Sequence, residues 1–438
     1  MKNSIQIKNG KIVTPTGIVK GNIVIEKGCI TQITSQVPAT KADMYIDAQD
    51  RFILPGFIDI HTNGIAGFDL TSGKYDLKTG MFYSDEETYL KSLNQALRHY
   101  TQTGVTRVVL TSLAAPLEQL KNIFRYVSQY KHSTGKAPWK NVLGGLYVEG
   151  TFMKLKDYRG AHNTEYFHSP SIDLFNELQN ACNGLIKVVN IVPEWEDSAL
   201  DLIEYLTVQK IVCAAGHTNA SGIQYEKAIK KGLRLAVHFL NGPTGSSSKS
   251  LDGGGAIEKV LRTDEMYVEI IVDGYHVDKS YVLDTIKRKG YEKVIAITDS
   301  MFAAKINNLK NFEIFGVKGK VSLNGNYLQI ADRPTELFGS ILTMDKAFSN
   351  ILTWLTRPIE GVWYEIHSPL EFEEALVKTA ALCSANPAKI LGIYDSKDTT
   401  GSIEIGKNAD ILIAKITQNE QGYQLTPQKV IVKGQLTE

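Results

Sequence analysis

Three polar residues stand where metal chemistry would need them, each near the end of an apolar, strand-like run. Glu149 lies in "NVLGGLYVEG", His217 in "KIVCAAGHT" and His238 in "LRLAVHFLN". Two imidazoles and one carboxylate can bind a divalent metal and leave a coordination position open for water, as catalytic zinc sites require. The metal would also supply the counter-charge that such a buried group needs. We therefore predict a metal site formed by Glu149, His217 and His238.

His61 and Asn63 lie in the stretch "PGFIDIHTNG", at the end of another apolar run. Residues two apart in a β-strand face the same side, so a His-x-His pair here would be ready to hold a metal. The second member is asparagine, which is a poor ligand for a transition metal. We expect His61 and Asn63 to line the pocket, or at most to form a weak second metal site.

Asp299, in "KVIAITDS", adds a fifth ionisable residue at the end of a fifth apolar run. The ordinary role for an aspartate in this context is that of a helix N-cap. A single histidine at a strand end is also more often structural than functional. Five such residues at five strand ends are hard to explain by packing, and the set is His61, Glu149, His217, His238 and Asp299.

The apolar runs that carry these residues number eight, and helix-like segments separate them. Continuous apolarity is typical of strands buried on both faces, as in a parallel sheet. Eight β/α units over about 250 residues predict an α/β fold of the (β/α)₈ (TIM barrel) type, with its active site at the carboxyl ends of the strands. A doubly wound sheet would need a Gly-rich first turn, and none is present. We expect strands at 57–61, 106–112, 141–150, 186–194, 210–218, 233–241, 267–274 and 293–300.

Both ends of the chain have a different pattern, in which short strands alternate apolar and polar residues. Turn signals such as Asn9-Gly10 separate the first strands, and "GSIEIGKNADILIAKI" near the other end has the same character. We predict a small β-sandwich domain built from residues 1–54 and 396–438, around a barrel domain at 55–395.

Composition excludes several classes of protein. The 438 residues carry a formal net charge of +1, which argues against a general nucleic-acid or membrane-surface binder. No run approaches the roughly 18 apolar residues of a membrane span. The first residues lack the apolar core of a signal peptide. The four cysteines form no C-x-x-C pair, so we expect reduced thiols in a cytoplasmic protein.

Ten segments, taken together and in order, resemble the N-acetylglucosamine-6-phosphate deacetylase family of the amidohydrolase superfamily. They cover nearly the whole chain, and their order is more specific than any one of them. The segments are "PGFIDIHTNG", "GLYVEGTF", "RGAH", "AAGHTNAS", "VHFLNG", "VDGYHVD", "AITDSM", "GSILTMDKA", "SANPAKILGI" and "GSIEIGKNADILI".

The resemblance implies metal-dependent hydrolysis of the acetamide of N-acetylglucosamine 6-phosphate, a reaction of amino-sugar catabolism, by a homodimer. It implies one divalent ion per subunit on Glu149, His217 and His238, with zinc the first choice and iron the second. Asp299 would be the catalytic acid and base. His162, in "RGAH", would help to hold the oxyanion.

The same resemblance implies a set of substrate-contacting residues, and those at 337–339 belong to a loop that closes over the substrate. The set is Ala161, His162, Asn241, Gly242, Asp273, Gly274, Tyr275, His276, Leu337, Phe338 and Gly339.

Three positions depart from the family pattern. Tyr147 stands where the family often has histidine, and Thr151 where it usually has proline. Lys249 stands where the family places an arginine that reaches the phosphate of the neighbouring subunit's substrate. Lysine can hold a phosphate but lacks the bidentate fork of arginine. The Ser- and Gly-rich stretch 245–255 around it is alternatively a flexible loop.

Two other hypotheses stay open. The same mechanism could act on another N-acyl amino sugar or on an N-acyl amino acid. The chain could also be a ligand-binding relative without activity, although such a relative would have no need of an intact acid, base and ligand set. Residues 357–369 match no motif, and His367 among them is expected to be structural or solvated.

Overall fold

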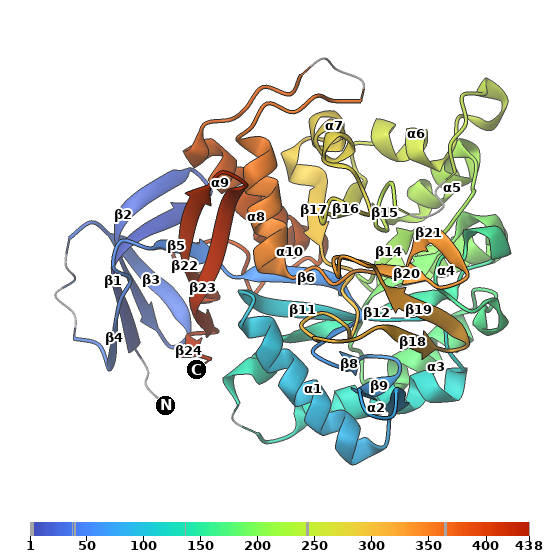
Figure 1. Cartoon of the computed structure of the whole chain (residues 1–438), viewed down its shortest axis with the longest axis horizontal. Coiled ribbons are helices and arrows are strands. Elements are labelled where there is room, and N and C mark those ends of the chain that lie inside the picture. The colour runs from blue at the N-terminus through green and yellow to red at the C-terminus, as the bar shows by residue number, and fades with distance from the viewer. Residues whose placement is uncertain are drawn as a thin grey trace.

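The structure is a computed structural model that describes residues 4–36, 38, 41–135, 137–241, 245–362 and 366–437. A barrel forms the larger part, and a β-rich unit that contains both chain ends lies beside it (Figure 1).

The predicted (β/α)₈ barrel is confirmed. Eight parallel strands form one sheet in which spatial order follows chain order. Nearly all their side chains are buried, as continuous apolar runs require. The strands are β6 (Phe57–Thr62), β11 (Val105–Ser112), β12 (Leu143–Phe152), β13 (Ile186–Ile191), β14 (Val212–Ala215), β15 (Leu233–Ala236), β16 (Tyr267–Ile271) and β17 (Val294–Ile297).

The first and last strands meet through residues of the predicted site. The backbone N–H of Asp299 donates to the His61 carbonyl over 2.9 Å, and the Asn63 N–H donates to Ser300 O over 2.7 Å. The seam between β6 and β17 therefore places His61, Asn63 and Asp299 side by side at one end of the barrel.

Amphipathic helices surround the barrel, one after each strand. Their buried residues recur at helical spacing, and caps fix their ends; Asp85, for example, accepts a hydrogen bond from Thr88 N at the start of α1. The described residues contain no helix that is long and apolar enough to cross a membrane. The helices are α1 (Glu86–Thr101), α2 (Leu117–His132), α3 (Ile172–Ala181), α4 (Asp197–Val208), α5 (Gly222–Lys231), α6 (Ala256–Arg262), α7 (Lys279–Lys289) and α8 (Met344–Leu355), with α9 (Phe372–Ala380) and α10 (Asn386–Ile390) following.

Both chain ends contribute to one eight-stranded sheet with an isoleucine-rich core of its own. The segments meet where β5 and β22 pair antiparallel, with Pro55 opposite Ile411. This confirms a β-rich terminal domain drawn from both ends. Its strands are β1 (Ser4–Thr14), β2 (Gly17–Glu26), β3 (Cys29–Thr34), β4 (Met44–Asp47), β5 (Phe52–Pro55), β22 (Ile411–Asn419), β23 (Gly422–Val432) and β24 (Gln435–Leu436).

Two small four-stranded sheets decorate the barrel. The first is β7 (Gly64–Ile65), β8 (Phe68–Asp69), β9 (Gly73–Asp76) and β10 (Met81–Tyr83). The second, which we call the insert sheet, follows β17 and consists of β18 (Asn311–Ile314), β19 (Val317–Val321), β20 (Leu328–Ile330) and β21 (Arg333–Leu337). The insert sheet leads directly into the predicted substrate loop at 337–339.

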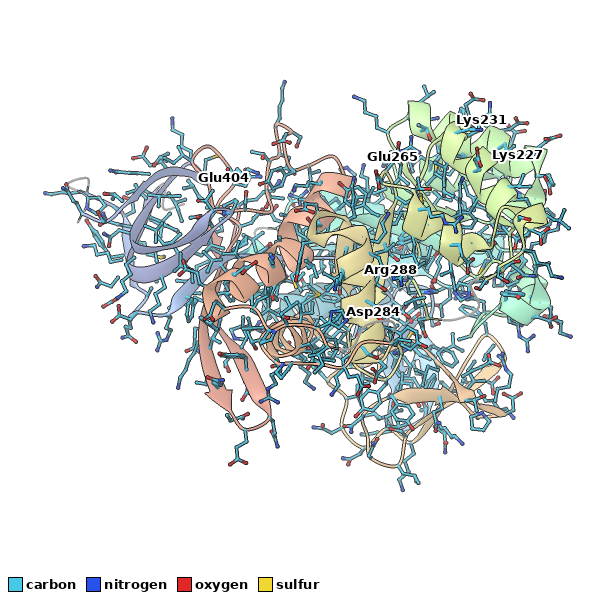
Figure 2. All side chains as sticks on the ribbon, turned by 90° about the horizontal axis from the view of Figure 1, so that it is seen from above. Lys227, Lys231, Glu265, Asp284, Arg288 and Glu404 are labelled. Atoms are coloured by element: carbon cyan, nitrogen blue, oxygen red, sulfur yellow. The ribbon has the colours of Figure 1, made fainter. Side chains whose placement is uncertain are left out.

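The unmatched segment 357–369, of which 363–365 lie outside the described residues, packs against α7. Its His367 Nε2 lies 2.7 Å from Asp284 Oδ1, and Val362 N donates to Asp284 Oδ2 over 2.9 Å. Figure 2 shows Asp284 and Arg288 on α7. His367 is thus structural, as expected for a histidine outside every motif.

Candidate active site

A cavity of about 410 Å³ opens at the carboxyl ends of the barrel strands, where a TIM barrel carries its chemistry. Most of the side chains singled out in the sequence line it. They are Asn63, Glu149, Ala161, His162, His217, His238, Asn241, Tyr275, His276, Asp299, Leu337, Phe338 and Gly339.

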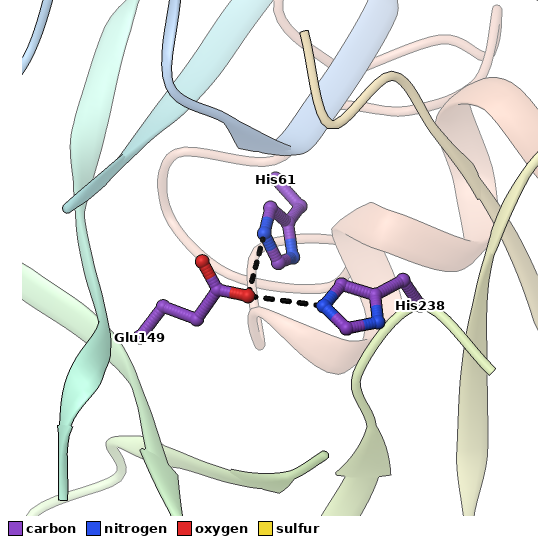
Figure 3. A group of neighbouring side chains, drawn as sticks. All are labelled: His61, Glu149 and His238. Atoms are coloured by element: carbon purple, nitrogen blue, oxygen red, sulfur yellow. Dashed lines mark hydrogen bonds and ion pairs between the residues drawn. The ribbon is translucent and has the colours of Figure 1, made fainter. Parts of the chain in front are cut away.

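One carboxylate oxygen, Glu149 Oε1, is the centre of the cluster. His238 Nε2 lies 3.0 Å from it and His61 Nε2 3.5 Å (Figure 3). His217 Nε2 lies 3.4 Å from the same oxygen. All four side chains are buried. Within the part of the chain that the structure describes, two groups of three could hold a metal ion: His61, Glu149 and His238, and Glu149, His162 and His217. The predicted ligands are thus divided between two groups that share Glu149.

The spacing within this cluster suits a bound ion. Two ligand atoms about 2.1 Å from a tetrahedral ion lie about 3.4 Å from each other, close to the separations measured here. His217 Nδ1 lies 2.9 Å from the Tyr158 carbonyl, and His238 Nδ1 lies 3.1 Å from the Asn241 carbonyl. Each carbonyl accepts a hydrogen bond from Nδ1–H, which assigns the tautomer and leaves the Nε2 lone pair free for a metal.

Strained backbone delivers three of the site residues. His217, His238 and Asp299 have φ values of 58°, 24° and 46°, in a region that non-glycine residues rarely occupy. Such conformations cost of the order of 1–3 kcal/mol each and concentrate at functional sites. They follow strands that end two residues earlier, whereas Glu149 lies inside a strand, because β12 continues to Phe152. These three strands therefore end earlier than predicted, and β12 ends later.

His162 faces the same carboxylate with a different tautomer. Its Nδ1 accepts a hydrogen bond from Ala114 N over 3.1 Å, so the ring proton is on Nε2, which lies 3.6 Å from Glu149 Oε2. Burial lowers the pKa of His162 to about 3. A neutral imidazole that presents an N–H to the cavity is a hydrogen-bond donor and a poor metal ligand.

Asp299 shares the cavity wall with Asn63. The Asn63 amide donates to Asp299 Oδ1 over 3.0 Å, and His61 Nε2 lies 3.6 Å from the same oxygen. Burial raises the pKa of Asp299, although the charge of His61 opposes the shift. A raised pKa brings the carboxyl closer to the range in which a group can both take and give a proton.

Glu269 was not anticipated. Its Oε2 lies 2.9 Å from His61 Nδ1 and 3.2 Å from the backbone N of His238, and it is fully buried. The available signal was a lone carboxylate within the apolar run "YVEIIVDG". Tyr147, the departure noted above, packs its ring 4.8 Å from that of His61.

Asp273 holds His276 in place at the cavity wall. Its carboxylate accepts from the backbone N–H of Tyr275 and His276, and lies 2.6 Å from His276 Nδ1. Gly274, with φ at 77°, makes the turn between them. Asp273 and Gly274 are thus beside the cavity, while Tyr275 and His276 line it.

Besides Asp273 and Gly274, two predicted substrate contacts are not among the lining residues. Gly242 lies outside the described residues. Lys249 is exposed on the loop before a short 3₁₀ helix and does not line the cavity of its own subunit. The described lining contains no lysine or arginine, and its members not foreseen from the sequence are Leu113, Asp157, Gly160, Met301, Thr335 and Glu336.

The chain is similar to known proteins in both sequence and fold. The model of the amidohydrolase family matches residues 52–437. The N-acetylglucosamine-6-phosphate deacetylase of Bacillus subtilis is 28% identical over 415 residues, covering 94% of this chain and 93% of that protein. The enzyme of the same name from Vibrio furnissii is 28% identical, covering 89% and 85%. The solved structure of the Pasteurella multocida enzyme of that name has a TM-score of 0.78 at 23% identity, covering 99% of both chains.

Proposed function

The chain belongs to the amidohydrolase family, and we propose that it hydrolyses the acetamide of N-acetylglucosamine 6-phosphate to glucosamine 6-phosphate and acetate. The observation that carries the proposal is the convergence of three imidazole nitrogens on Glu149 Oε1, with the carboxyl of Asp299 beside them. The curated relatives from Bacillus subtilis and Vibrio furnissii bear the name of this activity.

Glu149, His217 and His238 would hold one divalent metal ion, with zinc the first choice because two imidazoles and a carboxylate are a zinc ligand set. Iron is the second choice, since imidazole suits both metals. Such an ion lowers the pKa of bound water and polarises a carbonyl oxygen. His61, which is fully buried and, unlike Asn63, does not line the cavity, would remain beside Glu149, held by Glu269.

Asp299 would act on protons at both stages of the reaction. As a carboxylate it takes a proton from the attacking water, and it then gives that proton to the amide nitrogen. The C–N bond breaks as the nitrogen leaves as an amine, and acetate forms. His162 would donate a hydrogen bond from its Nε2–H to the carbonyl oxygen as negative charge develops there.

The sugar would be held by residues on the remaining sides of the cavity. Asn241 and His276 offer polar groups at the wall, and Asp273 orients the His276 ring. Residues 337–339, at the end of the insert sheet, would cover the substrate.

The phosphate would need a cation from elsewhere, because the described lining has none. We propose that Lys249 of a second subunit supplies it in a two-fold homodimer, in which the contact is reciprocal. The exposed side chain of Leu251, in the short 3₁₀ helix that follows Lys249, supports an interface there, since 85% of its surface faces solvent in the monomer. All four cysteines are free thiols, which supports a cytoplasmic location.

The same lining favours a second candidate. Asp157 places a carboxylate at the cavity, where it would repel a phosphate, and the other acidic residue of the described lining besides the site residues, Glu336, is paired with Arg333. The second candidate is therefore an N-acetylated amino sugar without phosphate, hydrolysed by the same residues.

Acetate release from N-acetylglucosamine, with and without the 6-phosphate, separates the two candidates. We expect a preference of at least about tenfold for the phosphorylated sugar, since a hydrogen bond to a charged group contributes about 1.5–3 kcal/mol. Equal rates would refute the phosphate assignment. No acetate from either sugar, in protein that carries metal, would refute the deacetylase itself.

A further inference from the structure

A second cavity, of about 500 Å³, lies next to the active site between the loop 156–164 and the insert sheet. Four of its lining residues carry positive charge, and we call the cavity the basic groove. They are Lys156, Arg159, Lys318 and Arg333. Asp332 is the only carboxylate among the described lining residues.

Most of this charge lacks a carboxylate partner. Among the described residues, no ion pair includes Lys156, Lys318 or Arg159, and the Arg159 side chain donates only to the carbonyl of Lys156, from Nη1 over 2.9 Å. Arg333 is paired, with Glu336. In a chain whose net charge is +1, this is a local excess that an anion would relieve.

We propose that the basic groove binds an oxyanion of the phosphate or carboxylate class. A planar guanidinium offers two parallel N–H groups to such an anion, and the ammonium group on the opposite wall adds point charge. Arg159 stands on the loop and Lys318 on β19, so one anion would contact both walls.

The anion would stabilise the part of the loop that shapes the active site. The two walls already touch at two points: Arg333 Nη2 donates to Gly160 O over 2.9 Å, and Asn163 Nδ2 donates to Phe315 O over 3.0 Å. The same loop carries the Tyr158 carbonyl that orients His217.

His162 connects the groove with the chemistry, because it lines both cavities. An anion that holds the loop would hold the Nε2 proton of His162 toward the cavity. Two sources of the anion are possible: a free anion that acts as an effector, or an anionic group of the substrate itself. The second source rests on the proposed function.

Binding of inorganic phosphate to the metal-loaded protein, followed by calorimetry, tests the site without any turnover. We expect Lys318→Gln and Arg159→Gln each to weaken binding at least about tenfold, equivalent to about 1.4 kcal/mol. Lys320→Gln is the matched control, because Lys320 lies on the same strand but not in the groove, and it should bind phosphate as the parent does.

Unchanged phosphate binding in both groove variants would overturn the proposal. So would phosphate binding that Lys249→Gln abolishes and the groove variants leave intact, since the anion would then belong to the active site. Neither result depends on deacetylation, so failure of the proposed function is distinguished from failure of the groove.

Kinetics then identify the source of the anion. For a free effector, inorganic phosphate raises the rate on unphosphorylated N-acetylglucosamine in the parent and in Lys320→Gln, but not in Lys318→Gln. For the substrate's own group, inorganic phosphate competes instead, and Lys318→Gln raises KM for the phosphorylated sugar at least about tenfold. Phosphate that binds without either effect would contradict the coupling through the loop.

Discussion

The side-chain amide of Asn63 donates a hydrogen bond to Asp299 Oδ1 over 3.0 Å, so the two are locked together where β6 and β17 meet. A His-x-His pair on the first strand would have offered an imidazole here. The amide instead stabilises the ionised form of Asp299 without binding a transition metal. Asn63 therefore acts on the catalytic acid/base Asp299 and not on a metal, and we expect a single strongly held metal ion.

Replacing that donor with an acid should shift the pH dependence of the reaction. In Asn63→Asp a second carboxylate lies beside Asp299, and like charge raises its pKa further. The ionised form is the base, so the acidic limb of the kcat/KM profile should move to higher pH. Asn63→Ala is the control that removes the donor without adding charge, and it should shift less. An unshifted acidic limb in Asn63→Asp would mean that Asp299 is not the base.

Metal content should depend on the proposed ligands, such as His217, and not on His61 of the first barrel strand. Elemental analysis of protein purified without chelator should find close to one equivalent in the parent and much less in His217→Asn, with activity lost. Two equivalents in the parent, one of them lost in His61→Asn, would show that the first strand holds a metal after all.

His162 should matter for rate and not for metal retention, because its Nε2 carries a proton. Loss of one oxyanion donor costs about 10²–10³ in kcat. We expect that loss in His162→Ala with metal content unchanged, and partial recovery in His162→Gln, whose amide can donate. A variant that loses its metal together with its activity would identify His162 as a ligand.

Glu269 should stabilise the metal site through its hydrogen bonds to His61 and to the backbone of His238. Removing its carboxylate leaves His61 Nδ1 and the His238 N–H without a buried acceptor, each costing about 1–3 kcal/mol. Glu269→Ala should lower both the free energy of unfolding and metal affinity, the latter by about 10–100-fold. Glu269→Gln keeps an acceptor and should be milder. Chelator competition measures the metal affinity, and equal affinity in the parent and Glu269→Ala would contradict the role.

Stability against acid should depend on Asp398, which lies 3.0 Å from Arg107 of β11 and 2.8 Å from Lys433. Burial opposes the shift, but these cations hold the pKa of Asp398 well below its usual range. A depressed carboxyl pKa stabilises the fold above the unfolded-state value of about 3.9, and this contribution is lost as pH falls below it. Asp398→Asn should therefore unfold more easily at pH 7, with the difference shrinking toward pH 3. A pH-independent difference in denaturant midpoint would refute the ion-pair explanation.

The sequence predicted the barrel because strands buried on both faces need continuous runs of apolar residues, and such runs are recognised from residue type alone. The ends of those strands were harder to predict. Three strands stop early, and the site residues that follow them have a left-handed backbone: His217, His238 and Asp299. The types of these side chains do not predict that conformation. The site residues were found nonetheless, because polar residues beside apolar runs are visible without exact boundaries.

The sequence did not predict hydrogen-bond partners that act through the backbone or that lie far away along the chain. The Tyr158 carbonyl orients His217 from 59 residues away, and residue type carries no trace of that contact. Glu269 was visible as a lone acid in an apolar run, but its partner His61 is 208 residues distant. The basic groove likewise needs two segments that only the fold brings together.

The pairing of β5 with β22 has a consequence for the order of events at the ribosome. Pro55 leaves the exit tunnel early, but its partner Ile411 is made only after the whole barrel has been translated. Until then β5 presents an unpaired edge, which invites contact with other nascent chains. The isoleucine-rich unit is therefore finished last although it is begun first, and a chaperone that shields its first strands would have to wait for almost the entire polypeptide.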